Sequence, residues 1–309
     1  ALEQAEETCG REVERASRLG FRIITWFDPG YPRSLEDLDL PPPVLYCRGE
    51  VPESPMIAIV GSRQAEPYGL EVAELFAAHL AGAGLAIVSG FARGVDAASH
   101  RGAVQVEAGR TVAVLGCGLD LDYPRGQRRL RERVSRHGAL LSEFPLGTSP
   151  LARNFPVRNR IIAALGLGTL VVQATARSGS LITARLALGL GREVWAIPGR
   201  ILDQRAVGPN TLIRAGAFLV QHPRDILESL PRSVRRDLPS PDAPPSSQPA
   251  AAGTAESRLL GALPLGEALT PEAIARRCDL PIDEVLRRLL ELELTGRVRR
   301  YPGPRYSRL

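Results

Sequence analysis

Seven short apolar runs, separated by turns and helical stretches, dominate residues 55–230. The runs do not alternate with polar residues, which is typical of strands covered on both faces. Helical stretches between such strands imply right-handed crossovers and a parallel, doubly wound sheet. The runs are residues 57–60, 85–88, 112–115, 139–141, 170–172, 194–197 and 218–220.

Proline placement divides the chain on either side of this region. Residues 1–54 combine a charged, helically spaced start with the run Pro41-Pro42-Pro43, which fits neither a helix nor a central strand. We expect a remnant of a helical domain there, followed by a stiff connector. Residues 231–253 are rich in Pro, Ser and Ala and hold too little apolar surface to fold, which predicts a linker.

Residues 254–309 predict a small second domain. Thr270 and Pro271 are typical of a helix N-cap and a first helical position. A second helix is expected from near Pro281 to Gly296, followed by a basic two-stranded wing. This order indicates a winged helix, with duplex DNA and a protein both open as its ligand. The wing arginines are Arg297, Arg299, Arg300, Arg305 and Arg308. The predicted fold class is therefore α/β, with a doubly wound, mostly parallel, Rossmann-like sheet in residues 55–230 and a C-terminal winged helix.

All 39 basic residues are arginines, and the chain contains no lysine. This excludes chemistry that needs a lysine, such as a P-loop or a Schiff base. Arginine grips phosphate in bidentate fashion and stacks on bases. The four cysteines lie far apart without CxxC spacing, so neither a disulfide framework nor a metal site is expected. No apolar run is long enough to cross a membrane, and we expect a cytoplasmic protein without a cofactor.

Glycines and small hydroxyl residues follow four of the predicted strands. The carboxyl ends of parallel strands meet at one edge of a sheet, where ligands bind. Glycine lets a ligand approach the backbone, and helix N-termini attract anions. A dinucleotide site is disfavoured because Gly116-x-Gly118 lacks the third glycine of that motif. The turns predict a phosphate-binding edge made of Gly61, Ser62, Arg63, Ser89, Gly90, Arg93, Gly116, Ser178, Gly179 and Ser180.

Two further features bear on the ligand. Arg63 is expected at a helix start, where it is unfavourable beside the helix dipole unless an anion is present, so we favour a phosphate clamp over a surface salt bridge. The acid-free stretch 153–160 is typical of a single-strand-binding surface, although a helix N-terminus with a hydrophobic staple explains it equally well. Its candidate contacts are Phe155, Arg158, Asn159 and Arg160. His100 near Asp96 is interpreted as structural, because no nucleophile stands beside it in sequence.

A series of motifs follows one order along roughly residues 25–220. They are Tyr31-Pro32, Pro41-Pro42-Pro43-Val44-Leu45-Tyr46, Val60-Gly61-Ser62-Arg63, Ser89-Gly90 with Ala92, Gly94-Val95-Asp96 and His100, Leu115-Gly116-Cys117-Gly118 with Asp120, Tyr123-Pro124, Ser142-Glu143, Phe155-Pro156 with Arg158-Asn159-Arg160-Ile161-Ile162-Ala163, Ser178-Gly179-Ser180-Leu181-Ile182-Thr183-Ala184, Pro198-Gly199, and Gly208 with Asn210 and Leu212-Ile213. This series resembles the DNA-processing protein A (DprA/Smf) family. The tail is similar to that family's winged-helix domain, more loosely.

The resemblance implies a protein without enzymatic activity that coats incoming single-stranded DNA during natural transformation. It also implies a homodimer formed through the Rossmann-like domain and loading of the RecA recombinase. Phosphate contacts fall on Gly61, Ser62 and Arg63, and strand contacts on the 155–160 candidates. Gln173 stands where relatives usually have glutamate, which argues further against acid–base catalysis.

The alternative is an enzyme, a Rossmann-like nucleotide N-glycosidase similar to the lysine-decarboxylase-like (LOG) phosphoribohydrolases. Those enzymes have a Pro-Gly-Gly-x-Gly-Thr-x-x-Glu loop. The comparable loop at 178–185 lacks the glutamate. Release of free base from nucleoside monophosphates would discriminate the two hypotheses.

Overall fold

The computed structural model describes residues 2–238, 255–263, 268–294, 298–301, 303 and 305–308. Its contacts divide the chain into two compact units, unit 1 (Ala1–Pro241) and unit 2 (Asp242–Leu309). Among the described helices, none is long and apolar enough to span a membrane.

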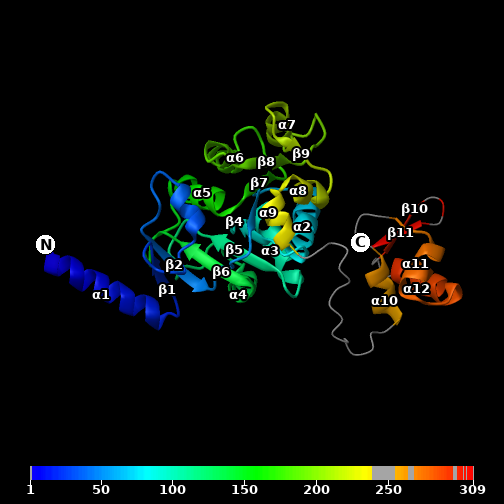
Figure 1. Cartoon of the computed structure of the whole chain (residues 1–309), viewed down its shortest axis with the longest axis horizontal. Helices are drawn as coiled ribbons and strands as arrows, with labels where there is room; N and C mark the ends of the chain where they lie inside the picture. Colours follow the sequence, from blue (N-terminus) through cyan, green and yellow to red (C-terminus); the bar gives the residue numbers. More distant parts are fainter. Residues whose placement is uncertain are drawn as a thin grey trace. The chain divides into compact units, whose positions relative to one another are not determined.

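A mostly parallel sheet forms the centre of unit 1 (Figure 1). Within the described residues it has nine strands in the order β1-β2-β6-β5-β4-β3-β7-β8-β9. Every predicted apolar run forms a parallel strand of this sheet, which confirms the predicted doubly wound architecture. These strands are β3 (Met56–Val60), β4 (Ala86–Ser89), β5 (Arg110–Val114), β6 (Gly138–Ser142), β7 (Gly168–Val171), β8 (Glu193–Ala196) and β9 (Phe218–Leu219).

The sheet begins earlier in the chain than the sequence predicts. Strands β1 (Arg22–Thr25) and β2 (Val44–Gly49) pair antiparallel with each other, and β2 pairs antiparallel with β6. The segment predicted as a connector therefore extends the sheet by an edge. The proline run ends before β2 begins, so it interrupts no strand, and Leu45 within β2 is fully buried.

Helices cover both faces of the sheet. One face packs against α5 (Asn154–Leu165) and α6 (Ser180–Gly189). The opposite face packs against α2 (Pro67–Gly82), α3 (Val95–Gln105) and α8 (Pro223–Ser229). This double cover explains why the strands are apolar on both sides. The remaining helices of unit 1 are α1 (Leu2–Arg18), the short 3-10 helix η1 (Arg33–Asp37), α4 (Arg128–Arg136), α7 (Val207–Arg214) and α9 (Arg232–Asp237).

Helix α9 lies at the start of the predicted linker 231–253. Val234 and Leu238 pack against the apolar core on the α2 side of the sheet, so this part of the segment belongs to unit 1. These two apolar residues precede the Pro- and Ser-rich stretch, which explains why the folded region runs past residue 230. Residues 239–254 lie outside the described residues.

Unit 2 has the predicted winged-helix order. Helices α11 (Pro271–Cys278) and α12 (Ile282–Leu294) are followed by the antiparallel pair β10 (Val298–Tyr301) and β11 (Arg305–Arg308). Thr270 is the N-cap of α11, and its Oγ1 accepts a hydrogen bond from the Ala273 N–H at 3.4 Å. An additional helix, α10 (Ala255–Ala262), contributes Leu259 to a separate core. The predicted helix end at Gly296 lies outside the described residues.

Candidate nucleic-acid interface

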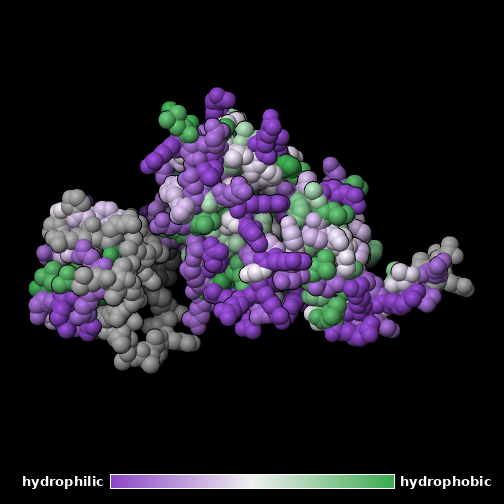
Figure 2. All heavy atoms as spheres, turned by 180° about the vertical axis from the view of Figure 1, so that it is seen from behind, coloured by the Kyte–Doolittle hydropathy of each residue, from purple (hydrophilic) through white to green (hydrophobic). Residues whose placement is uncertain are grey.

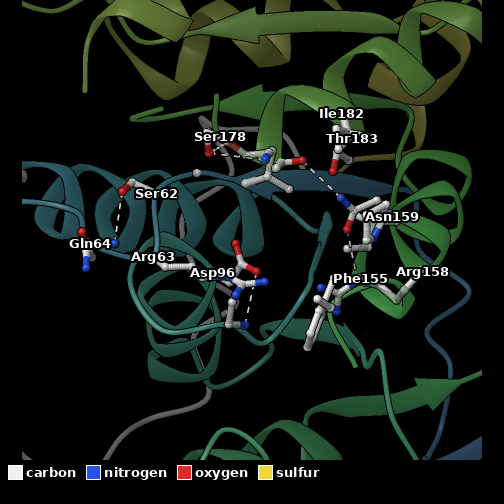
Figure 3. A pocket seen from close by; sticks show the side chains of 18 of the residues that line it. Ser62, Arg63, Gln64, Asp96, Phe155, Arg158, Asn159, Ser178, Ile182 and Thr183 are labelled. Atoms are coloured by element: carbon white, nitrogen blue, oxygen red, sulfur yellow. Dashed lines mark hydrogen bonds between the residues drawn. The ribbon is translucent and has the colours of Figure 1, made fainter. Parts of the chain in front are cut away.

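The candidate site lies where the strand order of unit 1 changes direction. From β3 the chain builds outward through β4, β5 and β6, and from β7 it builds the other way through β8 and β9. The loops after β3 and β7 therefore diverge and leave a crevice at the carboxyl edge, where ligands of such sheets bind. A cleft of about 730 Å³ opens there (Figure 3). Of the predicted residues, it is lined by Gly61, Ser62, Arg63, Phe155, Arg158, Asn159, Ser178, Gly179 and Ser180.

A second cavity of about 560 Å³, here called the side cavity, adjoins the cleft. Arg63, Tyr123 and Phe155 line both. The side cavity adds three predicted residues, namely Gly90, Arg93 and Gly116, together with Arg125. The Arg93 guanidinium donates a hydrogen bond to the Arg125 carbonyl oxygen at 3.3 Å. The two cavities together form one site with Phe155 at their junction.

Arg63 presents an exposed cation at this junction. Its guanidinium carbon lies 4.9 Å from the centroid of the Phe155 ring, within the range of a cation–π contact. Within the described part of the chain, the Arg63 guanidinium makes no salt bridge or hydrogen bond. Helix α2 begins only at Pro67, so Arg63 is in the preceding loop and the helix-dipole argument for it was wrong. Its unpaired charge in the cleft is the better support for a phosphate contact.

Three loops interlock to position the Arg63 turn. The Ser62 N–H donates to the Gln173 carbonyl oxygen at 2.6 Å, and the Val95 N–H donates to the Ser62 carbonyl oxygen at 3.2 Å. Gly94 has φ +83°, and a Cβ atom there would lie 2.2 Å from the Ser62 carbonyl oxygen. Only glycine permits both this backbone conformation and this close approach. The loops after β3, β4 and β7 are therefore one packed assembly.

Helix α5 turns one face toward the cleft. Because each residue rotates by about 100° around a helix, Phe155, Arg158 and Asn159 share that face while Arg160 points away. The Arg160 guanidinium pairs with the Glu143 carboxylate at 2.5 Å and donates to the Leu40 carbonyl oxygen at 2.9 Å. Arg160 lines neither cavity, so the structure does not bring it together with the other predicted strand contacts.

Arg158 forms part of the cleft floor and has little exposed surface. Its side chain is 3% exposed and donates hydrogen bonds to the carbonyl oxygens of Gly90, at 2.6 Å, and of Val114. Burial lowers the pKa of Arg158 to about 10, and the field of Asp96 opposes that shift, so the group remains cationic at neutral pH. Burial likewise raises the pKa of Asp96, and Arg158 opposes that shift. Arg158 therefore adds positive potential at the cleft floor, and its hydrogen bonds connect the carboxyl ends of β4 and β5.

The opposite wall of the cleft is the start of α6. The Ser178 and Ser180 hydroxyl oxygens lie 2.8 Å apart, and the Asn159 side-chain amide donates to the Gly179 carbonyl oxygen at 3.2 Å. The Asn159 bond fixes the distance between α5 and this turn. The α6 N-terminus and the serine hydroxyls give the wall donors suited to an anion.

Two residues that the sequence analysis considered, Ser89 and His100, are buried in the interior of unit 1. Ser89 is fully buried and its hydroxyl donates to the Ile59 carbonyl oxygen at 2.6 Å, so its prediction as a DNA contact was wrong. His100 is fully buried, and its Nδ1 lies 2.7 Å from the Thr111 hydroxyl. Burial lowers the pKa of His100 to about 3, so its imidazole is neutral at ordinary pH and has the predicted structural role.

Several cleft residues were not found from the sequence. Tyr123 is the most informative, because its ring centroid lies 5.7 Å from that of Phe155 and extends the aromatic surface. Its place in a turn that follows β5 was the available signal. Gln64, Thr175 and Thr183 also line the cleft. No cluster of metal-ligating side chains occurs among the residues that the structure describes.

Comparison with known families gives two matches along this chain. The family model "DNA recombination-mediator protein A" matches residues 22–231, and the model "DprA winged helix domain" matches residues 241–304. The chain is 45% identical to protein Smf of Escherichia coli, over 85% of this chain and 71% of that protein. It is 41% identical to the DNA processing protein DprA of Bacillus subtilis, over 77% of this chain and 81% of that protein.

Two solved structures are similar to this chain. DNA processing protein A of Streptococcus pneumoniae matches with a TM-score of 0.65 and 40% identity, covering 68% of this chain and 75% of that one. DNA processing protein A of Helicobacter pylori, whose structure addresses its single-stranded DNA binding mode, matches with a TM-score of 0.60 and 30% identity. That match covers 67% of this chain and 94% of the other.

Proposed function

The chain belongs to the DNA recombination-mediator protein A family, also called DprA/Smf, and on that premise we propose that it is a non-catalytic single-stranded DNA-binding protein. It would protect incoming DNA in natural transformation and load the RecA recombinase onto it. The observation that best supports the binding function is the unpaired Arg63 guanidinium over the Phe155 ring, in a cleft at the strand-order switch point.

The site chemistry favours a single strand over a duplex. Arg63 and the α6 N-terminus suit phosphates, while Phe155 and Tyr123 offer ring faces on which unpaired bases stack. Bases in a duplex are stacked on one another and present no free face. From Phe155 the strand would continue into the side cavity, past Arg93 and Arg125.

Fluorescence anisotropy with oligothymidine and with a duplex of equal length, each at two salt concentrations, tests this function. Arg63→Gln should weaken single-strand binding about tenfold or more, because a hydrogen bond to a charged group contributes about 1.5–3 kcal/mol. It should also reduce the salt slope by about 0.7, which is one phosphate contact. Arg11→Gln, at an exposed arginine on α1, is the matched charge control.

Two outcomes would contradict the proposal. One is unchanged binding by Arg63→Gln, and the other is a preference for the duplex. Incubating the protein with nucleoside monophosphates provides a third arm. Release of free base would favour the N-glycosidase alternative over a purely binding function.

We also propose a homodimer through unit 1. Strand β9 is a sheet edge, and its Phe218 and Leu219 side chains are about half exposed. Ile201 and Leu202, in the loop between β8 and α7, are nearly fully exposed. Figure 2 shows a mostly hydrophilic surface with separate hydrophobic patches, one of which projects at the upper left, beside the place where Figure 1 shows α7 from the opposite side. Exposed apolar edges of this kind pair readily with another chain.

Sedimentation of the wild type and of Phe218→Glu over a concentration series tests the dimer. The wild type should form dimers and the variant monomers, while a wild type that stays monomeric at micromolar concentration would refute this part. RecA loading is tested separately, by comparing filament assembly on bare oligothymidine and on oligothymidine coated with this protein. Coating should accelerate assembly, and equal rates would contradict the loading function.

A further inference from the structure

A further cavity of unit 1 lies beside the cleft, between the start of α2 and the loops after β7 and β8. Its volume is about 670 Å³. Gln64 lines the cleft and Glu66 lines this cavity, and Thr175 and Gln173 are divided in the same way. Because two residues span at most about 7 Å, the two cavities are neighbours. We call this space the Tyr68 cavity, and its lining includes Glu66, Tyr68, Gln173, Ile197, Arg200 and Asp203.

The Gln173 side chain gives the Tyr68 cavity a buried hydrogen-bond donor. Gln173 is 5% exposed, and its Oε1 accepts a hydrogen bond from the Glu66 N–H at 3.1 Å. Helix α2 holds this oxygen closely, since a Cβ atom at Gly69 would lie 2.2 Å from it. Nε2 is therefore the group that Gln173 presents to the cavity, and within the described residues it donates no hydrogen bond. A buried donor without a partner is costly, so Nε2 suits an acceptor on a ligand.

The rest of the lining combines an aromatic ring, an apolar wall and a cation. Tyr68, in the first turn of α2, is 55% exposed, and its ring pairs with no other ring in the part of the chain that the structure describes. Ile197 is buried in the wall. Arg200 is exposed, and it makes no ion pair with any described residue. These groups suit a flat, partly apolar ligand that carries a negative charge at one end.

The carboxylates in the lining indicate which part of a nucleotide would enter. Glu66 and Asp203 both pair with the Arg205 guanidinium, at 2.7 Å and 3.7 Å. A phosphate inside the cavity would meet two carboxylates, and the side chain of a lysine or arginine would meet Arg205 and Arg200. A nucleobase avoids both conflicts, because its carbonyl oxygens accept hydrogen bonds, its N–H groups donate to carboxylates, and its faces stack on rings.

We propose that the Tyr68 cavity holds one nucleobase of the single strand that occupies the cleft. The strand would leave the cleft past Gln64 and cross Arg205, whose Nε donates to the Gln64 carbonyl oxygen at 3.0 Å. Figure 3 shows Gln64 far to the left of Phe155, so the strand would extend away from that ring. The base would stack on Tyr68 and accept a hydrogen bond from Gln173 Nε2, with the adjoining phosphate near Arg200. This inference rests on the proposed single-strand binding function.

A series of oligothymidines that grow one nucleotide at a time tests the proposal in the full chain. Tyr68→Leu removes the ring, and Phe27→Leu is the control, because Phe27 is 96% exposed and lines none of the three cavities. In anisotropy competition, Tyr68→Leu should bind the shortest strands as the wild type does. Once the strand is long enough to reach the cavity, it should bind about fivefold or more weakly, because one stacked base is lost. Equal affinity at every length, or an equal loss with Phe27→Leu, would overturn the proposal.

Gln173→Glu tests the hydrogen bond to the base. This variant keeps an acceptor for the Glu66 N–H and replaces the Nε2 donor by a carboxylate oxygen. It should show the same length-dependent loss, and the loss should disappear when abasic residues replace the thymidines at one end of the strand. A loss that persists with abasic residues at either end would mean that the new charge repels phosphates, which would overturn the base contact. Tyr68→Leu tests the cavity independently, because Tyr68 is exposed and its side chain supports no core.

Arg63→Gln in the same series separates this inference from the proposed function. Arg63→Gln should weaken binding at every length, whereas Tyr68→Leu should weaken only the longer strands. Weakening by Arg63→Gln with none by Tyr68→Leu would refute the Tyr68 cavity alone, and no effect of either variant would refute both. A loss by Tyr68→Leu with thymidine monophosphate but not with the longer strands would assign the cavity to a free nucleotide and overturn the proposed strand path.

Discussion

Replacing Gly94 by alanine should damage DNA binding without removing any group that touches DNA. Gly94 has φ +83° and ψ −132°, a conformation that costs a residue with a side chain about 1–3 kcal/mol. The new Cβ would lie 2.2 Å from the Ser62 carbonyl oxygen and 2.8 Å from the Arg63 carbonyl carbon, so the Arg63 turn must move. Such overpacking costs about another 1–3 kcal/mol.

The free energy of unfolding should therefore fall by about 2–6 kcal/mol, and Tm by about 4 °C or more for a unit of this size. Oligothymidine affinity should fall about tenfold, or 1.4 kcal/mol, because the Arg63 charge is retained but displaced. Calorimetry and anisotropy measure the two effects. Gly20→Ala is the control, since Gly20 also has positive φ, +74°, but has nothing within 4 Å of the new Cβ. A Gly94→Ala protein with the Tm and affinity of the wild type would show that close packing at Gly94 does not position the Arg63 turn.

The remaining predictions concern three other side chains. Phe155→Leu should weaken oligothymidine binding by about 1–3 kcal/mol in anisotropy while Phe155→Tyr retains it, because stacking needs a ring; equal losses in both would argue against stacking. Arg160→Gln should leave that affinity within about twofold of wild type, since its guanidinium is paired with Glu143, and a tenfold loss would return Arg160 to the site. Folding lowers the pKa of His100 from 6.5 to about 3, so below pH 6.5 the unfolded chain binds a proton that the folded chain does not. The free energy of unfolding is therefore highest above pH 6.5 and falls as the pH is lowered. About 2 kcal/mol of that stability should be lost between pH 6.5 and pH 5 in the wild type. Urea unfolding of His100→Gln should show a flatter pH dependence over that range, and parallel curves would contradict a buried neutral histidine.

The strands of the sheet could be predicted because burial on both faces leaves a plain apolar run. Strands β1 and β2 could not be predicted as part of the sheet, because they are short, lie at an edge and flank a proline run. The clustering of the glycine-rich turns could also be predicted, because the carboxyl ends of parallel strands meet at one edge of a sheet. The strand order, which sets the cleft between the loops after β3 and β7, depends on long-range pairing that has no local signal.

Side-chain direction limited the prediction of site residues. Arg158 and Arg160 are two residues apart, yet the first supports the cleft floor and the second pairs with Glu143 behind it. Their residue types are the same, and only the helix phase separates them. Ser89 ends a strand as Ser62 follows one, but its hydroxyl turns into the sheet and bonds to Ile59. Arg63 was placed in the site for a reason that does not hold, because α2 begins after it.

The position of a bound oligothymidine tests the central claim most directly. Crystals of the full chain grown with a short oligothymidine should show a phosphate on the Arg63 guanidinium and a base against the Phe155 ring, with the strand leading into the side cavity. An oligothymidine bound elsewhere on unit 1, with the cleft between Arg63 and Ser178 empty, would contradict the account.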